Sequence, residues 1–495
     1  MVRSVSVQIA ELLKDWPCAV KGSTRTEISG IEDDTRKITA GALFIARRGQ
    51  KYNGKNFLTE ALEKGAAAIA IDDELLYDSI DFPVPIIWVP NCESFIAYAS
   101  AKMYGFPSEA LKIVAVTGTN GKTTVTHFIS QLLQQLKQQV IVIGTNGIYV
   151  NGEKQYEEIE NLTTLQAKDL QFICAEAIRR EIPYIVLEAS SMGLLKHRLD
   201  YCNIQLGVFL NITEDHIEEH GSFEKYKQAK EILARLSEKI VVNRDDAMCR
   251  SIGLASKKKT IFFGKTNYVD YHWQLLTDSV SQSSCCLQFR NEKHIVTFPL
   301  TGDYQCSNVI AAMSTVKELG FSLDEICLAV QKLTLPEGRF QKIENALGIM
   351  IYIDYAHTPD AMKMLLQTIR KQAKSRVIVV FSCGGERDKI KRPKMGLIAS
   401  TYADYIILTT DNARSESPQL INEQIIEGFS STQQYEINLD RKQAIEKALT
   451  LAKKDDTVVI LGKGHEKTQH VGRKIDYFSD QQCVIQLLKQ LELKM

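Results

Sequence analysis

The chain has 495 residues, which is enough for two to four domains that each bury a core of their own. Hydrophobic residues make up 44% of the chain and charged residues 24%, as in an ordinary globular protein. Lysine plus arginine balances aspartate plus glutamate at 60 each, which excludes a general electrostatic attraction to nucleic acid or to an anionic membrane.

The N-terminus and the cysteines indicate the compartment. The segment MVRSVSVQIAELLKDW has polar and charged residues where a signal peptide needs an unbroken apolar core, and no apolar run approaches membrane-spanning length. The eleven cysteines are odd in number and include no CxxC pair, which is typical of free thiols in a reducing compartment. We therefore expect a cytoplasmic protein without a membrane or nucleic-acid partner.

Residues 1–107 are expected to form a small N-terminal α/β domain. Short apolar runs predict strands at 43–47, 67–71 and 85–89, and helices are expected at about 57–64 and 93–104. The turn residues GFPS at 105–108 mark its end.

The second domain, residues 108–335, begins with a strand, a glycine-rich turn and a helix. Residues 113–116 form an apolar run typical of a buried parallel strand, and apolar residues recur at helical spacing from Val125 to Leu136. Between them the backbone N–H groups of a turn and the N-terminus of the helix can converge on phosphate oxygens. Lys122 is placed to bridge terminal phosphates, and the Thr123 hydroxyl to bind a phosphate-bound Mg²⁺. The turn residues are Gly118, Thr119, Asn120, Gly121, Lys122, Thr123 and Thr124.

This P-loop is a shortened form of the common one. The usual spacing requires a further glycine at position 116, where this chain has Val116. An ordinary strand-to-helix turn is the alternative interpretation, but a turn alone requires neither the Lys122 and Thr123 pair nor two glycines at this separation.

The rest of the second domain alternates strands and helices. Apolar runs at 140–144, 184–188 and 206–210, with a helix at about 167–180, predict a doubly wound parallel sheet. From 259 to 299 the strands follow one another with few helical stretches, which indicates a local antiparallel excursion.

Three segments of this domain carry candidate site residues. Glu188 ends the strand YIVLE at the carboxyl edge of the sheet, where a carboxylate beside a P-loop can hold Mg²⁺. Asn211 lies at the tip of the next strand, followed by Asp215 and His216, for which we favour a metal or phosphate role over a solvated loop.

Lys230 is unexpected on a core-facing surface. In FEKYKQAKEILARL, a rotation of 100° per residue places Lys230 between Phe223 and Tyr226 on the apolar face of a helix. Spacing alone favours a lysine that reaches out to solvent. The alternative is that burial lowers its pKa, so that the neutral amine can add CO₂ and become a carbamate near the metal.

Residues 336–495 are expected to form a C-terminal Rossmann-like α/β domain. Four apolar strands, MIYID, VIVVF, YIILT and TVVIL, alternate with helices near 360–372 and 441–453. The loops DYAHTPD, CGGERDKIKRP, DNARSESP and GKGHEKTQ follow these strands, so that four polar loops meet at one edge of the sheet. Four such loops together indicate a binding site.

The motifs resemble those of a known family. TGTNGKTT, EASS with a following HR, NITEDHIEEHG, YKQAK, GRF, DYAHTPDA, CGGERDKIKRP, DNAR and GKGHEKTQ occur in the order found in the Mur ligases. The resemblance spans all three domains, although DDTRKITAGALFIARRGQ is the distinctive segment of the first. Such ligases phosphorylate a substrate carboxylate with ATP, and an amine then attacks the acyl phosphate.

The resemblance is to the members that add the third residue of the peptidoglycan stem peptide. It implies ATP and Mg²⁺ as cofactors, UDP-MurNAc-L-Ala-D-Glu and meso-diaminopimelate as substrates, and a monomer. It assigns ATP phosphates to Gly118–Thr124, with further nucleotide contacts from Asn308, Arg339, Asp354 and His357. Catalytic and metal roles fall on Lys122, Thr123, Glu188, His216 and a carbamylated Lys230.

The resemblance also assigns the other two substrates. The UDP-MurNAc-dipeptide would contact Asp33, Thr35, Gln50, Thr163, Thr164, Ser190, Lys196 and Arg198. Diaminopimelate would contact Arg387, Asp411, Asn412, Ala413, Arg414, Gly462 and Glu466. An arginine pairs bidentately with the distal carboxylate of diaminopimelate, which L-lysine lacks. An unpaired buried guanidinium costs roughly 3–5 kcal/mol, or a hundredfold or more in affinity. We therefore predict diaminopimelate.

This chain departs from the family pattern at four positions. Thr35 replaces a serine with the hydroxyl kept, Met192 replaces a histidine, and Lys196 stands where glutamine is frequent. Ala413 stands where proline is usual, which makes the DNAR turn less rigid. The effect on the free energy of unfolding is only about 0.4–1 kcal/mol.

Three alternatives remain open. The lysine-adding ligases of the same family generally lack the arginine of DNAR. Folylpolyglutamate synthase shares the shortened P-loop but lacks the DNAR and GKGHE pair. A P-loop switch that only hydrolyses nucleotide would leave the loops of the third domain without a purpose.

Overall fold

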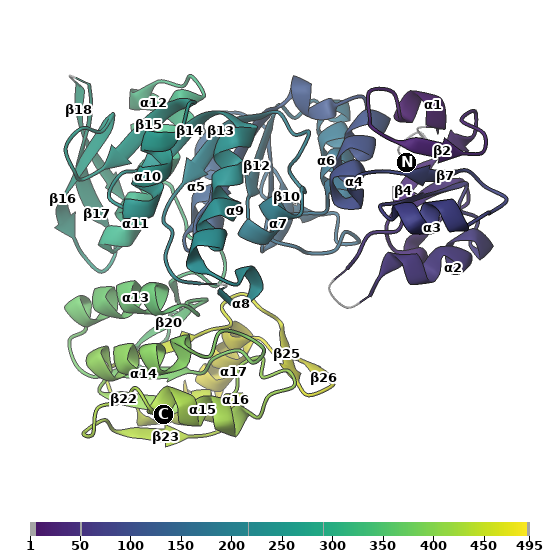
Figure 1. The fold of residues 1–495 in the computed structure, drawn as a ribbon. Helices are drawn as coiled ribbons and strands as arrows, with labels where there is room; N and C mark the ends of the chain where they lie inside the picture. The colour runs from purple at the N-terminus through teal and green to yellow at the C-terminus, as the bar shows by residue number, and fades with distance from the viewer. Residues whose placement is uncertain (1–5, 50–51, 216, 291, 493–495) are drawn as a thin grey trace.

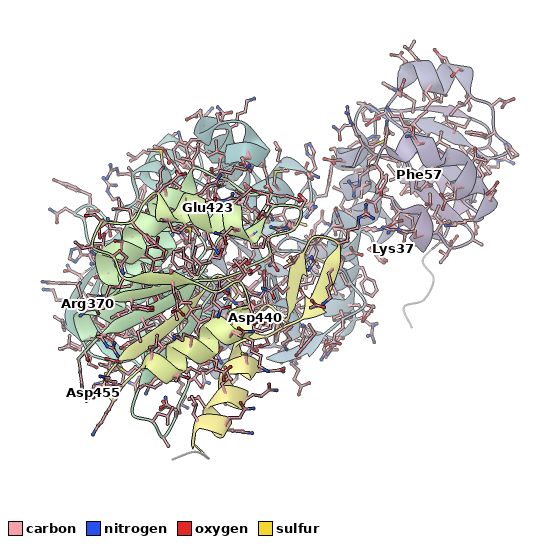
Figure 2. The ribbon with its side chains drawn as sticks, turned by 90° about the horizontal axis from the view of Figure 1, so that it is seen from below. Lys37, Phe57, Arg370, Glu423, Asp440 and Asp455 are labelled. Atoms are coloured by element: carbon pink, nitrogen blue, oxygen red, sulfur yellow. The ribbon has the colours of Figure 1, made fainter. Side chains whose placement is uncertain are left out.

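The computed structural model describes residues 6–49, 52–215, 217–290 and 292–492. Three sheets follow one another along the chain (Figure 1). In both ribbon views the C-terminal unit packs on the central unit and lies away from the N-terminal unit (Figures 1 and 2). The three-unit α/β architecture expected from the sequence is confirmed.

The N-terminal unit contains a five-stranded sheet. Its order is β2 (Ala19–Lys21), β7 (Ile86–Trp88), β6 (Ala68–Ile71), β5 (Ala42–Ile45) and β4 (Gly30–Glu32). The strands are parallel except β2, and a two-stranded ladder of β1 (Val7–Gln8) and β3 (Glu27–Ile28) lies beside them. Helix α4 (Cys92–Met103) buries Phe95 and Ile96 against this sheet.

The central sheet has eleven strands and supplies most of the site. Its parallel part runs β9 (Val140–Gly144), β12 (Tyr184–Glu188), β8 (Lys112–Thr117), β13 (Ile204–Phe209), β14 (Ser237–Asn243), β15 (Lys259–Gly264) and β16 (Tyr271–Asp278). These strands are almost wholly apolar because helices cover both faces. On one face lie α5 (Lys122–Gln135), α11 (Asp303–Glu318) and α12 (Leu323–Val330); on the other lie α6 (Ala167–Arg179), α9 (Phe223–Leu236) and α10 (Ala247–Ala255).

Antiparallel strands extend this sheet at both edges. Beyond β16 lie β17 (Ser283–Phe289) and β18 (Glu292–Phe298), so the predicted antiparallel excursion is confirmed for β16 to β18, whereas β15, at the start of the predicted range, is parallel to both of its neighbours. At the opposite edge β10 (Gly147–Val150) pairs antiparallel with β9, and β11 (Glu153–Gln155) pairs antiparallel with β10, a hairpin that the sequence analysis did not predict. The turn signals Asn146-Gly147 and Asn151-Gly152 mark this hairpin in the sequence.

The C-terminal sheet is parallel except for its first strand. Its order is β19 (Gln341–Lys342), β20 (Met350–Asp354), β24 (Thr457–Leu461), β21 (Val377–Phe381), β22 (Tyr405–Leu408) and β23 (Tyr435–Ile437). Around it lie α13 (Pro359–Gln372), α14 (Lys391–Tyr402), α15 (Pro418–Ile426), α16 (Arg441–Leu451) and α17 (Asp480–Glu492). A hairpin of β25 (Thr468–Val471) and β26 (Lys474–Tyr477) projects from it.

The segment that joins the central and C-terminal units is anchored on both sides. Thr334 exchanges two hydrogen bonds with the Gln131 side chain of α5. The Thr334 backbone N–H donates to Gln131 Oε1 at 2.9 Å, and Gln131 Nε2 donates to the Thr334 hydroxyl at 2.9 Å. Gly338 packs against the loop after β24, where an added Cβ would lie 2.1 Å from the His465 nitrogen. Among the described residues, no helix is both long and apolar enough to cross a membrane.

Candidate functional site

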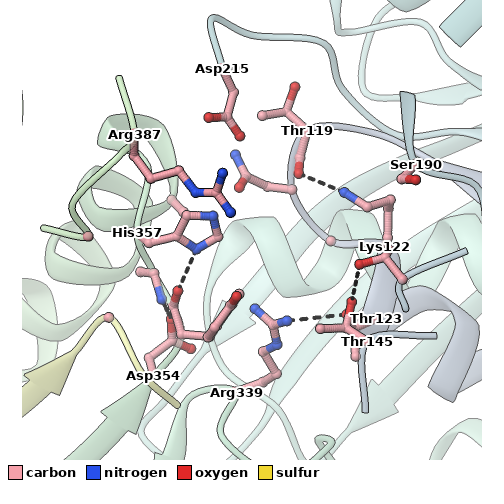
Figure 3. A pocket seen from close by; sticks show the side chains of 18 of the residues that line it. Thr119, Lys122, Thr123, Thr145, Ser190, Asp215, Arg339, Asp354, His357 and Arg387 are labelled. Carbon is pink, nitrogen blue, oxygen red and sulfur yellow. Dashed lines mark hydrogen bonds between the residues drawn. The ribbon is translucent and has the colours of Figure 1, made fainter. Parts of the chain in front are cut away.

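A cavity of about 470 Å³ lies where the C-terminal unit faces the carboxyl edge of the central sheet. Figure 3 shows Lys122, Thr123 and Ser190 on one side of it and Asp354, His357 and Arg387 on the other. Parallel strands direct their following loops to one edge, and here two such edges face each other. A ligand in this cavity would touch both units.

The segment from Gly118 to Thr124 joins β8 to α5, as the sequence predicts, and its last three residues form the first turn of that helix. Gly121 has φ +89°, and an added Cβ would lie 2.9 Å from Asn308 Oδ1, so the turn requires a residue without a side chain there. The Asn120 backbone N–H donates to Asn211 Oδ1 at 2.8 Å, and Asn211 Nδ2 donates to the Asn120 carbonyl at 3.0 Å. This pair fixes the turn to the tip of β13.

Two lysine amines converge under this turn. Lys122 Nζ donates to the Gly118 carbonyl at 2.8 Å and to the Thr119 carbonyl at 3.0 Å. Lys230 Nζ donates to the same Gly118 carbonyl at 3.0 Å and lies 4.7 Å from the centre of the Tyr226 ring. Two ammonium groups on one carbonyl oxygen repel each other, so the arrangement favours a neutral amine at one of them.

Lys230 is the amine whose charged form the surroundings disfavour more strongly. Its side chain is 1% exposed, so it does not reach solvent as spacing alone had suggested. Burial, reinforced by the nearby Lys122 charge, holds the pKa of Lys230 well below its ordinary value. Burial also lowers the pKa of Lys122, but Glu188 and Asp215 act in the opposite direction.

Glu188 is held in one orientation at the end of β12. The Thr145 backbone N–H donates to its Oε1 at 2.9 Å and the Thr145 hydroxyl to its Oε2 at 3.1 Å. Gly144 makes room for the carboxylate, because an added Cβ would lie 2.2 Å from Oε1. Thr145 was not singled out from the sequence, although it follows the predicted strand β9 at the same edge.

A hydroxyl cluster lies next to Glu188. The Thr164 hydroxyl donates to the Glu188 carbonyl at 2.8 Å, accepts from the Ser190 backbone N–H at 2.9 Å and lies 3.0 Å from the Ser190 hydroxyl. The hydroxyl oxygens of Thr163 and Thr145 lie 3.2 Å apart, and Arg198 donates to the Thr164 carbonyl at 2.8 Å. Thr163 and Ser190 line the cavity.

The C-terminal unit reaches the P-loop through two side chains. Arg339 Nη2 donates to the Thr123 hydroxyl at 3.2 Å, and its guanidinium lies 4.4 Å from the centre of the Tyr355 ring. Thr358 donates to Asn120 Oδ1 at 3.2 Å. The contacts join the second and third units at the candidate nucleotide site.

Asp354 and His357 follow β20 on the same side of the cavity. The Asp354 carboxylate accepts from the backbone N–H groups of Phe340 and Ala356, each at 2.6 Å, while burial raises its pKa. Burial, with a contribution from Lys391, lowers the pKa of His357 to about 4, so the imidazole is neutral at pH 7.

The four loops predicted to share an edge of the C-terminal sheet do so. Asn412 Nδ2 donates to Glu466 Oε2 at 2.8 Å, and Arg414 Nη1 donates to the Gly385 carbonyl at 2.5 Å. Arg387 forms an ion pair of 3.1 Å with Glu219 of the central unit. The residues of this group that line the cavity are Arg387, Asp411, Asn412, Arg414, Gly462 and Glu466. Ala413 is buried behind them, and its carbonyl lies 1.9 Å from where a Cβ on Gly385 would be.

The predicted contacts of the N-terminal unit have internal partners. Asp33 pairs with Arg47 at 2.5 Å and with Lys168 of the central unit at 2.9 Å. Burial alone would raise its pKa, but the two cations outweigh burial and lower it to about 2. The Thr35 hydroxyl donates to Glu60 at 2.9 Å.

Not every predicted site residue contributes to the wall of the cavity. The described residues that lie outside the wall are Asp33, Thr35, Gly118, Thr164, Lys196, Arg198, Lys230 and Ala413. Gln50 and His216 lie outside the described residues. Within the described part of the chain, no group of three or more His, Cys, Asp or Glu side chains suits a metal ion, so a metal here would need hydroxyl and ligand oxygens as well.

Three family models match the chain. They are the "Mur ligase family, catalytic domain" over residues 27–104, the "Mur ligase middle domain" over 116–316 and the "Mur ligase, glutamate ligase domain" over 338–464.

Curated relatives match over almost the whole length. A UDP-N-acetylmuramoyl-L-alanyl-D-glutamate–2,6-diaminopimelate ligase of Caldanaerobacter subterraneus is 33% identical, with 98% of this chain and 100% of the relative covered. A second ligase of that name, from Clostridium acetobutylicum, is 34% identical over 95% of this chain and 97% of the relative.

Solved structures share the architecture. A ligase of the same name aligns with a TM-score of 0.67 at 30% identity and covers 98% of this chain and 99% of that chain. MurF from Acinetobacter baumannii has a TM-score of 0.68 at 18% identity over 98% of this chain and 99% of that chain, which shows the fold alone.

Proposed function

The chain belongs to the Mur ligase family, and from this premise we propose that it adds meso-diaminopimelate to the D-glutamate of UDP-MurNAc-L-Ala-D-Glu with ATP. The observation that carries the proposal is the cavity itself, which has a P-loop on one wall and two arginines, Arg387 and Arg414, on the other. A nucleotide-only enzyme would need the first wall and not the second. The relatives at 33–34% identity are named for the same reaction, which supports the proposal.

Acyl phosphate formation brings a carboxylate and a triphosphate together, so the site must neutralise charge. Gly118, Thr119, Asn120, Gly121, Lys122, Thr123 and Thr124 hold the ATP phosphates. Lys122 turns from its own loop carbonyls to the terminal phosphates when nucleotide binds. Asn308 and His357 complete the nucleotide side, and Arg339 leaves the Thr123 hydroxyl for a phosphate oxygen. Asp354 holds the two segments that carry Arg339 and His357 through the neighbouring backbone N–H groups of Phe340 and Ala356.

The residues present fit Mg²⁺, because hard oxygen donors line the same cavity as the P-loop. Glu188 offers a buried carboxylate that Thr145 orients, and Thr123 offers a hydroxyl. We assign both to the metal, together with His216. When bound, the metal would neutralise the charge that develops on the transferred phosphoryl group.

Lys230 fits the carbamate role that the resemblance implies. A neutral amine adds CO₂ with loss of one proton and gives an N-carboxylate anion. That anion would lie beside Lys122, where it turns a repulsion between two amines into an attraction. The lowered pKa of Lys230 favours the neutral amine that the addition needs.

The amino-acid end of the cavity has the charges that diaminopimelate requires. Arg387 and Arg414 can pair with its distal carboxylate, and Glu466 with its distal ammonium. Asn412, Asp411, Ala413 and Gly462 shape the same pocket; a Cβ on Gly462 would lie 2.3 Å from Asp411 Oδ2. L-lysine would leave the arginines without that carboxylate.

The dipeptide acceptor lies between these two ends. Thr163 and Ser190 contact its muramoyl-dipeptide part, with Thr164, Lys196 and Arg198 behind them. Asp33, Thr35 and Gln50 meet the uridine end. The units 1–107, 108–335 and 336–495 thus bind the UDP-sugar, ATP and the amino acid respectively, within a monomer that acts in the cytoplasm on small molecules.

An ADP-release assay tests the proposal. With purified protein, ATP and Mg²⁺, release must depend on both UDP-MurNAc-L-Ala-D-Glu and meso-diaminopimelate, and L-lysine should support at most about one hundredth of the kcat/KM. Equal release without either substrate would indicate a plain nucleotide hydrolase. Equal kcat/KM values for the two amino acids would show that the enzyme also adds L-lysine and would contradict the predicted preference for diaminopimelate.

A further inference from the structure

Lys463 lies behind the amino-acid wall of the cavity with no exposed surface. Its ammonium group donates to Thr468 O at 2.6 Å, to Glu466 Oε2 at 3.1 Å and to Asn412 Oδ1 at 3.3 Å. All three of its donors therefore have acceptors, which is the condition for burying a charged amine without a large desolvation cost. The three acceptors come from the loop after β22, the loop after β24 and the first residue of β25.

This ammonium group fixes the orientation of the Asn412 amide. Asn412 Oδ1 also accepts from the His470 backbone N–H at 3.0 Å, and its Nδ2 donates to Glu466 Oε2 at 2.8 Å. With two donors on the oxygen and an acceptor on the nitrogen, the amide cannot rotate by 180° without losing all three bonds.

The same group fixes the Glu466 carboxylate. Its Oε2 is shared by Lys463 and Asn412, while Oε1 lies on the other side, 3.5 Å from the Tyr355 hydroxyl. The side chain of Glu466 is 28% exposed and lines the cavity. Oε2 is thus held by two protein donors, whereas Oε1 has only the long contact to the Tyr355 hydroxyl.

We propose that Lys463 is a positioning residue for the amino-acid substrate: without touching it, Lys463 aims Glu466 and Asn412 at the substrate ammonium and keeps the two loops in register. The inference rests on the proposed function of the pocket. A carboxylate that is held on one oxygen presents the other at a fixed angle, so substrate binding loses little further side-chain entropy. Supporting residues of this kind are worth about 10- to 100-fold in the affinity that they organise.

The test replaces Lys463 by methionine, which keeps the length of the side chain and removes its charge. Lys463→Met should raise the KM for diaminopimelate by about 10- to 100-fold. The KM values for ATP and for the UDP-dipeptide should stay within twofold, which a general loss of structure would not allow. The matched control is Lys467→Met, because Lys467 is an exposed neighbour in the same loop; it should behave as wild type.

A double variant separates positioning from mere stability. In Glu466→Gln the neutral amide no longer needs a cation, so adding Lys463→Met should change the KM for diaminopimelate by less than about threefold. This double variant contains no unpaired buried charge and should fold even if Lys463→Met alone does not.

Three results would overturn the inference: an unchanged KM in Lys463→Met, fully additive effects in the double variant, or equal rises in the KM of all three substrates. If wild-type protein releases no ADP with diaminopimelate, the proposed function has failed instead.

Discussion

The fit between Gly144 and Glu188 gives the sharpest test of the candidate metal site. In Gly144→Ala the new Cβ would lie 2.2 Å from Glu188 Oε1, whereas ordinary contact begins at 3.4 Å, so the carboxylate must move by about 1 Å. Glu188 is 1% exposed, so the space left for its carboxylate is the cavity that it lines, away from Thr145. Both of its hydrogen bonds to Thr145, at 2.9 and 3.1 Å, must lengthen or break.

The expected loss follows from these contacts. Hydrogen bonds to a charged group contribute about 1.5–3 kcal/mol each, so the two together hold the carboxylate with about 3–6 kcal/mol. A displacement of about 1 Å at a reacting site costs about 100-fold in rate, or about 2.7 kcal/mol of barrier. We therefore expect kcat to fall about 100-fold in Gly144→Ala, with the KM for ATP within threefold of wild type.

The assay is steady-state ADP release at saturating substrates, together with the Tm of each variant. Gly30→Ala is the control, because an added Cβ on this other strand glycine meets nothing within 4 Å. A kcat within threefold of wild type for Gly144→Ala, in a protein of unchanged Tm, would refute the argument that Glu188 must lie where Thr145 holds it.

Three further predictions concern single side chains. Lys230→Ala should lower kcat by at least about 100-fold, whereas Lys227→Ala on the same helix should not; activity of Lys230→Ala in CO₂-free buffer equal to that of wild type would exclude the carbamate. Arg414→Ala should raise the KM for diaminopimelate by about 10- to 100-fold and leave the KM for ATP unchanged; an unchanged KM for diaminopimelate would remove Arg414 from the pocket. The pKa of Asp33 is about 2 in the folded protein, below its unfolded value, so the stabilisation of about 2 kcal/mol is complete above pH 4 and is lost as the pH falls toward 2. Urea unfolding should show this loss between pH 4 and 2 in wild type, and Asp33→Asn should be less stable at pH 7 and lack that part of the pH dependence.

The strands were predictable because their apolar runs are long and lie between clear turn signals. β8, β12 and β13 appear in the structure within two residues of the predicted bounds. The β10–β11 hairpin was missed because its strands are short and partly exposed, although its Asn-Gly pairs were visible.

The sequence predicted single residues of the candidate site at the ends of their strands, but not the contacts between them. Helical periodicity placed Lys230 on a buried face, but it could not show that Lys230 and Lys122 meet at the Gly118 carbonyl. The pairing of Thr145 with Glu188 depends on the parallel register of β9 and β12, which are some forty residues apart in the chain. Lys463 was passed over for a similar reason, since its partners lie on two loops and a strand.

The two anchors of the joint segment limit how the C-terminal unit can swing. Thr334 is fastened to α5, and Gly338 is wedged against the loop that carries His465. If the C-terminal unit rotates relative to the central unit and both contacts are kept, only the backbone dihedral angles of residues 335–337 can change. The amino-acid wall of the cavity and Arg339 then move together as one rigid body about these three residues. A rotation that brings the substrate amine toward the acyl phosphate therefore also moves the Arg339 guanidinium relative to Thr123.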